Sequence, residues 1–395
     1  MKTILYIYHT STIGGGSYCL LNILKAIDRT KYCPSVLLKE EGPLVDEISK
    51  LGIKVFLLSK IRTVPYNVST ITPKNIWNAF NIIASISSYE KLLQEIRPDI
   101  VYVNTMMLYP YLRSAKKYGA RTIIHIREHW PEGEHVWQRK IALQHIDKYA
   151  DHIVGINSYS ISMFDFSQKP KTVVYDWIDM KNRYEERPLS AIFGENMDNK
   201  KVFLYMGGMQ PIKGGKQIIT TFSAKIDDPN ARLLVMGINT TVFRNGWKAN
   251  LKRILTHFGY ESYTETVLDA IKNDKRIKCI PSTYMINHIV QQAYCVLSYF
   301  TIPHANLALA ESIILGTPSI AVDTPESREY SSNGKMALLF PINDINGFEN
   351  AIAEFKYRRE NILNNIQRNS HLIKDMFSPE SNIKKLHELF DYITR

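Results

Sequence analysis

Residues 1–27 read MKTILYIYHTSTIGGGSYCLLNILKAI, an apolar run followed by three glycines and then by apolar residues at helical spacing. The pattern predicts a buried strand at Thr3–Tyr8 and a helix at Ser17–Ile27. Glycines in such a turn let the backbone approach a ligand closely, and the N-terminus of the helix offers N–H groups to an anion. Cys19 stands where the third glycine of a dinucleotide fingerprint would be, and no G-K-[ST] of a P-loop follows. The turn therefore predicts an anion site of another kind or, alternatively, a tight connection with no ligand.

Short apolar runs and segments of helical period continue to alternate along the chain. Further strands are predicted at Ser35–Leu38, Lys54–Leu58, Ile100–Val103, Thr122–Ile126, His152–Ile156, Thr172–Tyr175, Val202–Met206, Arg232–Met236, Arg276–Ile280, Cys295–Phe300, Ser319–Val322 and Ala337–Phe340. Further helices are predicted at Leu44–Leu51, Lys74–Ile96, Tyr109–Tyr118, Val136–Tyr149, Leu307–Leu315, Glu360–Met376 and Glu380–Ile393. This order implies an α/β fold with parallel sheets covered by helices.

The length of 395 residues exceeds the roughly 250–300 residues at which a single hydrophobic core stops growing, and therefore predicts two domains. The polar, proline-containing stretch Asp179–Ser190 interrupts the alternation as a linker would. We expect Rossmann-like domains at residues 1–182 and 188–377, with a C-terminal helix at 379–395 that joins the first domain. Open α/β sheets bind ligands at the carboxyl ends of their strands, so the two sheets are expected to face a central cleft.

Composition and charge narrow the class of protein. With 45% hydrophobic and 22% charged residues, the chain is unlike disordered or fibrous proteins. The formal charge of +11 suggests an anionic partner, either nucleic acid, a membrane surface or a phosphorylated ligand, or else only a solvated basic face. The first apolar run is too short for a signal peptide, no run could span a membrane, and the four cysteines lack metal-site or disulfide spacing. We expect a cytoplasmic protein or one docked on the inner face of the cell membrane.

A second glycine-rich loop, Met206–Gly215 (MGGMQPIKGG), lies between a predicted strand and a predicted helix. Lys213 is suited to bind phosphate because its ammonium group would lie beside the N-terminus of the helix; the alternative is a solvated lysine. Glu311 lies among apolar residues of a later predicted helix, where a carboxylate needs a partner. A ribose diol would supply two hydrogen bonds, whereas the alternative is a buried glutamate that caps a backbone group.

These motifs together resemble the retaining glycosyltransferases of family 4, which have the GT-B fold, over nearly the whole chain. Residues Glu311–Ala321 (ESIILGTPSIA) are similar to the family signature E-A-x-A-x-G-x-P-V-I-A. Gly207–Gly214 matches the spacing of its G-R-x-x-x-x-K-G loop, and Gly14–Gly16 matches its N-terminal glycines. Arg276–Ser282 resembles the strand and loop that flank the nucleotide base.

The resemblance implies an N-terminal domain that binds the acceptor and a C-terminal domain that binds a nucleotide-sugar donor, without metal or other cofactor. The donor-binding residues that it implies are Gly15, Gly16, Gly208, Lys213, Ser282, His304, Ala305, Asn306, Leu307 and Glu311. Two positions depart from the family pattern. Gly208 stands where the second loop has arginine, and Pro303 stands where the E-x7-E motif has its first glutamate.

The sequence Ile124–His129 (IHIREH) follows a predicted strand, which the family commonly ends with a histidine and an acid facing the donor sugar. Either His125 or Arg127 takes the histidine position, with Glu128 as the acid, so these three residues and Lys213 are the catalytic candidates. The adjoining loop His129–His135 contains two histidines and two glutamates. Proline and glycine within it argue against a helix that would align metal ligands, so an acceptor-facing loop is favoured.

The expected activity is transfer of a sugar to a glycan or lipid-linked saccharide, with retention, in bacterial-type surface polysaccharide biosynthesis. The basic clusters Arg113–Arg121 and Lys356–Arg359 are candidates for contact with an anionic membrane. Nucleic acid is disfavoured because no recognised binding motif accompanies them. A non-catalytic, nucleotide-sugar-binding partner subunit is the main alternative, and an epimerase or glycogen-type phosphorylase of the same fold is another. The base, the sugar, the acceptor and the oligomeric state stay open at this stage.

Overall fold

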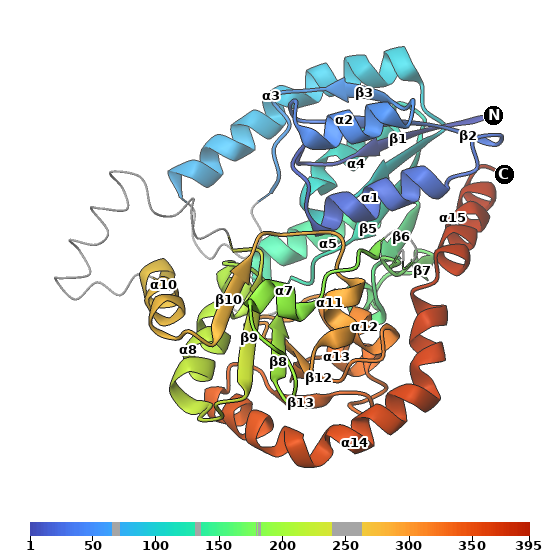
Figure 1. Ribbon diagram of the computed structural model, residues 1–395. Helices are drawn as coiled ribbons and strands as arrows, with labels where there is room; N and C mark the ends of the chain where they lie inside the picture. The colour runs from blue at the N-terminus through green and yellow to red at the C-terminus, as the bar shows by residue number, and fades with distance from the viewer. Residues whose placement is uncertain (65–71, 131–135, 179, 181–182, 239–262) are drawn as a thin grey trace. The chain divides into compact units, whose positions relative to one another are not determined.

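The computed structural model describes residues 1–64, 72–130, 136–178, 180, 183–238 and 263–395 (Figure 1). Contacts between Cα atoms divide the chain into two compact units. The N-terminal unit comprises Met1–Trp177 together with Met376–Arg395, and the C-terminal unit comprises Ile178–Asp375. Each unit is built around its own parallel sheet.

The sheet of the N-terminal unit has the strand order β3-β2-β1-β4-β5-β6-β7, and every pairing in it is parallel. Its strands are β1 (Lys2–Ile7), β2 (Tyr32–Leu38), β3 (Lys54–Leu57), β4 (Ile100–Val103), β5 (Arg121–Ile126), β6 (His152–Gly155) and β7 (Lys171–Val173). The inner strands are apolar at successive positions, as strands covered on both faces must be; β4, for example, is buried along its whole length.

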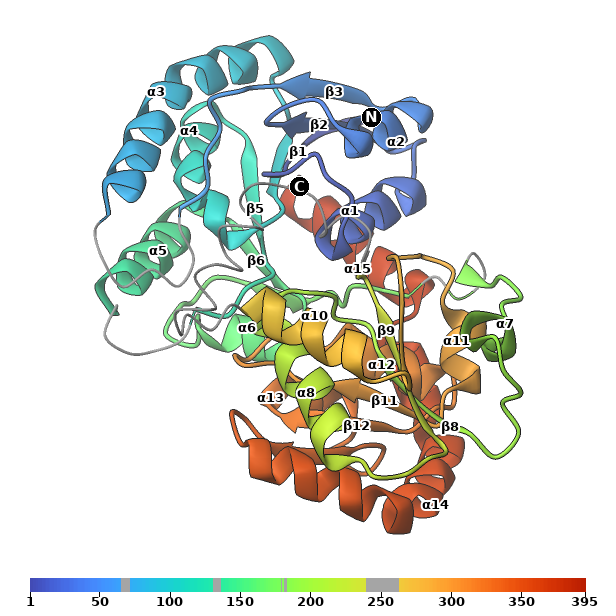
Figure 2. The same cartoon turned by 60° about the vertical axis from the view of Figure 1, so that its left-hand side comes forward.

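Helices cover both faces of this sheet (Figure 2). On one face, where Ile4 and Tyr6 point, lie α1 (Gly15–Ala26), α2 (Pro43–Lys50) and α15 (Pro379–Ile393). On the other face lie α3 (Pro73–Ile96), the 3₁₀ helix η1 (Met106–Tyr111), α4 (Leu112–Lys117), α5 (Val136–Tyr149) and the short α6 (Ser158–Ser162). The hydroxyl of Tyr32 donates to Asp391 of α15 at 2.6 Å, which helps to fix the C-terminal helix to this unit.

The sheet of the C-terminal unit has the order β10-β9-β8-β11-β12-β13 and is also parallel throughout. Its strands are β8 (Lys201–Tyr205), β9 (Ala231–Met236), β10 (Ile277–Ile280), β11 (Cys295–Ser298), β12 (Ser319–Asp323) and β13 (Leu338–Pro341). Its helices are α7 (Leu189–Phe193), η3 (Pro211–Lys213), α8 (Gly215–Lys225), α10 (Tyr263–Asn273), α11 (Asn287–Gln292), α12 (Leu307–Ile314), α13 (Pro325–Tyr330) and α14 (Ile345–Met376), the last of which reaches the first residue assigned back to the N-terminal unit.

The two parallel sheets confirm the predicted α/β class, and three details differ from the sequence-based prediction. The segment predicted as one helix at Tyr109–Tyr118 begins as the 3₁₀ helix η1, which contains Pro110, and becomes α-helical only at Leu112. The helix predicted at Glu360–Met376 is the second half of the longer α14. The helix α7 begins inside the stretch predicted as a linker. In the described part of the chain, no helix has the length and apolar character that crossing a bilayer would require.

Candidate functional site

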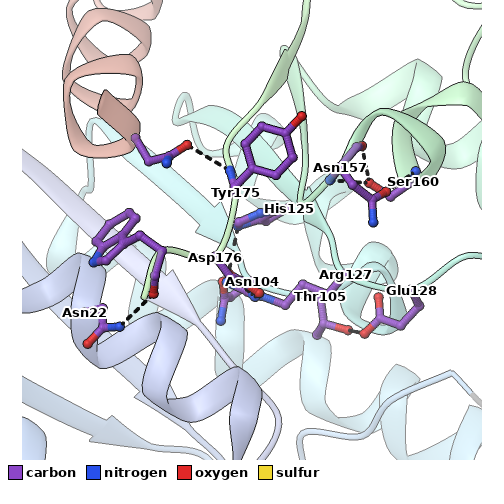
Figure 3. A network of polar contacts seen from close by, with 12 residues as sticks. Asn22, Asn104, Thr105, His125, Arg127, Glu128, Asn157, Ser160, Tyr175 and Asp176 are labelled. Atoms are coloured by element: carbon purple, nitrogen blue, oxygen red, sulfur yellow. Dashed lines mark hydrogen bonds and ion pairs between the residues drawn. The ribbon is translucent and has the colours of Figure 1, made fainter. Parts of the chain in front are cut away.

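Arg127 follows β5 directly and is the centre of a buried polar network in the N-terminal unit (Figure 3). Its Nη1 donates to both carboxylate oxygens of Asp176, at 2.7 and 2.6 Å, and its Nε donates to Oδ1 of Asn104 at 3.1 Å. Burial is the largest single effect and disfavours the charged guanidinium, but the carboxylate of Asp176 and the neighbouring groups of Cys19 and Tyr102 together outweigh it and raise the pKa of Arg127. The residue is therefore a permanent cation held in one orientation at the carboxyl end of the sheet.

His125 lies within β5 and is fully buried. Its Nδ1 lies 2.8 Å from the hydroxyl of Tyr102 and 3.5 Å from Nη2 of Arg127. Burial, and secondarily the charge of Arg127, hold the pKa of His125 well below its usual value, so the ring is neutral at physiological pH. A fully buried ring beside the Arg127 guanidinium is suited to a positioning role, and direct catalysis by His125 stays a prediction.

Glu128 is turned toward the start of η1, away from Asp176. Its Oε1 accepts a hydrogen bond from the hydroxyl of Thr105 at 2.5 Å, and its Oε2 accepts the backbone N–H of Met106 at 3.0 Å. Burial raises the pKa of Glu128 above its usual value, although these hydrogen bonds oppose the shift. Arg127 and Glu128 thus leave the same strand end in different directions, a difference that the sequence motif did not reveal.

The first glycine turn presents an uncapped helix N-terminus. The N-cap residue of α1 is Gly14, no side chain accepts a hydrogen bond there, and the first turn carries no acidic residue. Gly15 and Gly16 are its first two residues. A Cβ atom at Gly16 would lie 2.5 Å from the hydroxyl of Tyr8, so a larger residue would require that ring to move. An N-terminus without a side-chain cap is suited to an anion, and the anion site at this turn stays a prediction.

Lys213 ends η3 in the second glycine-rich loop, immediately before α8. Gly214 follows it with a φ of +66°, and a Cβ atom there would overlap the carbonyl oxygen of Tyr299, so this position requires glycine. Burial lowers the pKa of Lys213, while the carboxylate of Glu311 opposes the shift. No residue in the described ranges forms an ion pair with its Nζ within 4 Å. A partly buried ammonium of this kind is suited to an anionic ligand.

Glu311 lies on α12 and is 9% exposed, and its partner is Arg183. Nη1 of Arg183 donates to Oε1 of Glu311 at 2.5 Å. Nε of Arg183 donates to the carbonyl oxygen of Tyr284 at 3.3 Å, and its guanidinium lies 4.7 Å from the centre of the Tyr284 ring. Arg183 was missed by the sequence analysis, which treated its surroundings as a linker. No spacing in the sequence signals an ion pair between residues 128 positions apart.

The loop before α12 contains the next predicted donor contacts. Burial, and then the charge of Lys213, lower the pKa of His304 to about 4, so its ring is a neutral hydrogen-bonding group near the lysine. Asn306 is fully buried and caps α12: its Oδ1 accepts the N–H of Leu309 at 3.2 Å and the hydroxyl of Ser298 at 2.8 Å. The Asn306 side chain therefore serves the fold. Ala305 and Leu307 are partly exposed, and their roles as donor contacts stay predictions.

Gly208, which stands where the family pattern has arginine, is constrained by its backbone conformation. Gly208 has a φ of +62°, and a Cβ atom there would lie 3.1 Å from the carbonyl oxygen of Gly237. The exposed Ser282 also approaches Gly237, since its Oγ lies 3.3 Å from where a Cβ of that glycine would be. Gly208, Gly237 and Ser282 thus gather beyond the ends of β8, β9 and β10, and a side chain at position 208 is disfavoured by the fold itself.

The remaining predictions are only partly covered by the structure. Residues 131–135 of the loop for which metal binding was considered lie outside the described residues, as do residues 179 and 181–182 of the predicted linker. Within the described ranges, no group of three or more His, Cys, Asp or Glu is arranged to hold a metal ion, and the metal-independent activity stays a prediction. In the predicted basic cluster on α4, Lys116 pairs with Asp151 and Lys117 with Glu90.

The C-terminal unit matches a known family. Residues 192–371, which include Lys213 and Glu311, match the family model described as glycosyl transferases group 1. The sequence has no match among curated proteins.

Solved structures resemble the chain over its full length. The structure of HepE from Anabaena in complex with UDP and glucose has a TM-score of 0.74 and 16% identity, covering 99% of this chain and 100% of its own. A glycosyltransferase from Rickettsia africae has a TM-score of 0.70 and 14% identity over 100% and 99% of the two chains. Sucrose-phosphate synthase from Thermosynechococcus elongatus has a TM-score of 0.67 and 14% identity, again over 100% and 99%. Similarity at these identities establishes the fold and confirms the predicted GT-B class.

Proposed function

We propose that the chain is a glycosyltransferase that takes a nucleotide-sugar donor in its C-terminal unit. The observation that carries the proposal is the match of residues 192–371 to a glycosyltransferase family over the unit that contains Lys213, Arg183 and Glu311. These three residues, two cations and one carboxylate, form a partly buried cluster with a net positive charge. A diphosphate is the part of a nucleotide sugar that such a cluster stabilises best.

In the proposed reaction Lys213 neutralises the diphosphate as the bond between it and the anomeric carbon breaks. Glu311 accepts hydrogen bonds from the ribose, and the loop at His304–Leu307 orients the sugar. The acceptor oxygen forms the new bond to the anomeric carbon on the same face, and its proton passes to an oxygen of the departing diphosphate. The nucleoside diphosphate leaves with that proton, so the atoms balance without a metal, another cofactor or an external base.

In the N-terminal unit, we propose that the amides at Gly15 and Gly16 contact the diphosphate and that Arg127 and Glu128 contact the sugar or the acceptor. His125 and Asp176 then act as positioning residues because they hold the Arg127 guanidinium. The proposed acceptor is a glycan or a lipid-linked saccharide, in synthesis of a surface polysaccharide on the cytoplasmic side of the membrane. This part of the proposal rests on the resemblance of the sequence motifs and on the basic charge of the chain.

The proposal is tested by measuring release of nucleoside diphosphate from a panel of nucleotide sugars, with and without saccharide acceptors. We expect one donor to be consumed, and we expect Lys213→Ala to lower kcat/KM by about 100-fold or more, as removal of a charged group that stabilises the transition state does. The matched control is Lys225→Ala. Lys225 lies on α8, the helix that follows Lys213, and its exposed ammonium pairs with Glu349, so kcat/KM should hardly change. Absence of turnover with every donor, in a protein that binds none of the nucleotides, would exclude the proposal.

A non-catalytic, nucleotide-sugar-binding subunit is the second candidate. It is favoured by Gly208 and Pro303, which replace two charged residues of the family pattern, and by the engagement of Glu311 with Arg183. It predicts nucleotide binding that depends on Lys213 but no release of nucleoside diphosphate from any donor. The same panel therefore separates the two functions.

A further inference from the structure

Hydrogen bonds hold the stretch predicted as a linker along α11. The side-chain amide of Asn287, the first residue of α11, donates to the carbonyl oxygen of Met180 at 2.8 Å. The next residue of the helix, His288, accepts the backbone N–H of Arg187 at its Nδ1, at 2.7 Å. We call the described residues of this stretch, Met180 and 183–189, the strap. Bonds of this kind give the strap a fixed path in the C-terminal unit.

The end of the strap is bonded to the same helix. Gln292 of α11 accepts the backbone N–H of Leu189 through Oε1 and donates through Nε2 to the carbonyl oxygen of Arg187, both at 3.1 Å. The strap is therefore attached to α11 before and after Arg183, whose side chain is only 9% exposed. An arginine is almost never buried unless it is paired. The position of this cation is thus set by α11, and its partners indicate its role.

Arg183 links the loop that follows β10 to the helix α12. Its Nη1 donates to Oε1 of Glu311 at 2.5 Å, and its Nε donates to the carbonyl oxygen of Tyr284 at 3.3 Å. The guanidinium also lies 4.7 Å from the centre of the Tyr284 ring. Within the described ranges, Oε2 of Glu311 has no hydrogen-bond partner. One carboxylate oxygen is therefore fixed by Arg183, and the other is left for a ligand.

The charges around Glu311 suit two different parts of a ligand. The Arg183 guanidinium and the Glu311 carboxylate neutralise each other, so the pair carries no net charge for a phosphate to bind. Lys213 has no ion-pair partner in the described part of the chain, and the Glu311 carboxylate is near enough to affect its pKa. A ligand with an anion beside hydroxyl groups matches this arrangement, with the anion at the ammonium and a hydroxyl at the carboxylate oxygen. A ribonucleoside diphosphate has both groups.

We propose that Arg183 is a positioning residue that turns the Glu311 carboxylate toward the ribose and thereby makes the protein selective for ribonucleotides. A glutamate side chain has several rotamers, and holding it in one of them before the ligand arrives removes part of the entropy cost of binding. Arg183 does not itself touch the ligand, because its Nη1 and Nε are occupied. The inference deepens the proposed function and rests on it, since Glu311 is there the acceptor of hydrogen bonds from the ribose.

Titration calorimetry with the full-length protein tests the inference without a saccharide acceptor. UDP, GDP, ADP and CDP are each compared with the corresponding deoxyribonucleoside diphosphate. For the base that is bound most tightly, we expect the ribose form to bind at least about tenfold better, as loss of a hydrogen bond to a charged group predicts. Arg183→Met should lower this ratio to about threefold or less, because the carboxylate of Glu311 is then no longer oriented.

A second variant and a matched control separate positioning from stability. Arg183→Lys keeps Glu311 paired and should fold even if Arg183→Met does not. It should still lower the ratio by at least about twofold, since one nitrogen replaces the Nε and Nη1 that hold Tyr284 and Glu311. The control is Arg232→Met: Arg232 of β9 pairs with Glu195 at the same 2.5 Å, and its side chain is 11% exposed. Its loss should leave the ratio unchanged.

An unchanged ratio in both Arg183 variants, or an equal loss in Arg232→Met, would overturn the inference. So would an unaltered protein that binds the ribose and deoxyribose forms equally well. The proposed function is measured separately, as release of nucleoside diphosphate by the unaltered protein, so it can stand when the inference fails. With the donor that is consumed, Arg183→Lys should raise KM and change kcat little, because the ribose contact is the same in the ground state and the transition state.

Discussion

Replacing Arg183 by methionine should destabilise the C-terminal unit, because Glu311 would remain buried without its ion-pair partner. Breaking a buried ion pair by removing one member costs about 3–5 kcal/mol. The lower end of this range applies here. The Glu311 carboxylate affects the pKa of Lys213, so the Lys213 ammonium is near enough to offset part of the carboxylate charge that Arg183→Met leaves unpaired. In a unit of this size, a loss of about 3 kcal/mol lowers the melting temperature by about 6–12 °C.

A double-mutant cycle isolates the interaction between the two side chains. Thermal and urea unfolding are measured for Arg183→Met, for Glu311→Gln and for the combined variant, which carries no unpaired charge. The combined variant should recover at least about 2 kcal/mol relative to the sum of the single effects. Arg328→Met is the matched control: Arg328 pairs with Asp323 at the same 2.5 Å, but its side chain is 59% exposed. The free energy of unfolding should change there far less than in Arg183→Met, because solvent screens an exposed pair.

Single effects of Arg183→Met and Glu311→Gln that add to within about 0.5 kcal/mol would refute the reasoning. So would equal losses for Arg183→Met and Arg328→Met, because burial would then make no difference. Either result would also remove the reason to include Arg183 in the donor-binding cluster.

Three other predictions concern single positions. In the unfolded chain the His304 ring binds a proton below about pH 6.5, whereas burial lowers its pKa to about 4 in the folded protein. Stability should therefore be unaffected by this ring above pH 6.5 and should fall, by up to about 3 kcal/mol, as the pH drops from 6.5 to 4; parallel pH profiles for His304→Gln and the unaltered protein would contradict this. Gly208→Arg restores the family residue, yet the left-handed φ of +62° should cost about 1–2 kcal/mol in urea unfolding without improving nucleotide affinity, and tighter binding in titration calorimetry would show the backbone argument to be wrong. Asp176→Ala leaves the Arg127 guanidinium buried without its carboxylate and should lower the free energy of unfolding by about 3 kcal/mol, a prediction that a loss below about 1 kcal/mol would rule out.

The fold was largely accessible from the sequence, because its signals are local. Each strand of both sheets overlaps a predicted apolar run, and the ends agree to within three residues, since buried parallel strands are apolar at successive positions. The helix boundaries were less accurate where local propensity misleads. Pro110 lies inside the 3₁₀ helix η1 and did not end a helix there. The helix α14 begins at Ile345, well before the predicted start at Glu360, although Phe348, Ala351 and Phe355 already recur at helical spacing.

The candidate site was accessible only in part, because its ion pairs join residues far apart in the chain. The position of Lys213 before α8 follows from the glycine-rich loop around it. The partners of Glu311 and Arg127 are 128 and 49 positions away and have no sequence signature.

A crystal structure of the protein with the nucleotide sugar that it binds most tightly would test the central claim most directly. The account predicts a diphosphate oxygen within hydrogen-bonding distance of Nζ of Lys213 and the ribose hydroxyls at the carboxylate of Glu311. A nucleotide bound elsewhere, with both side chains unchanged and untouched, would contradict it.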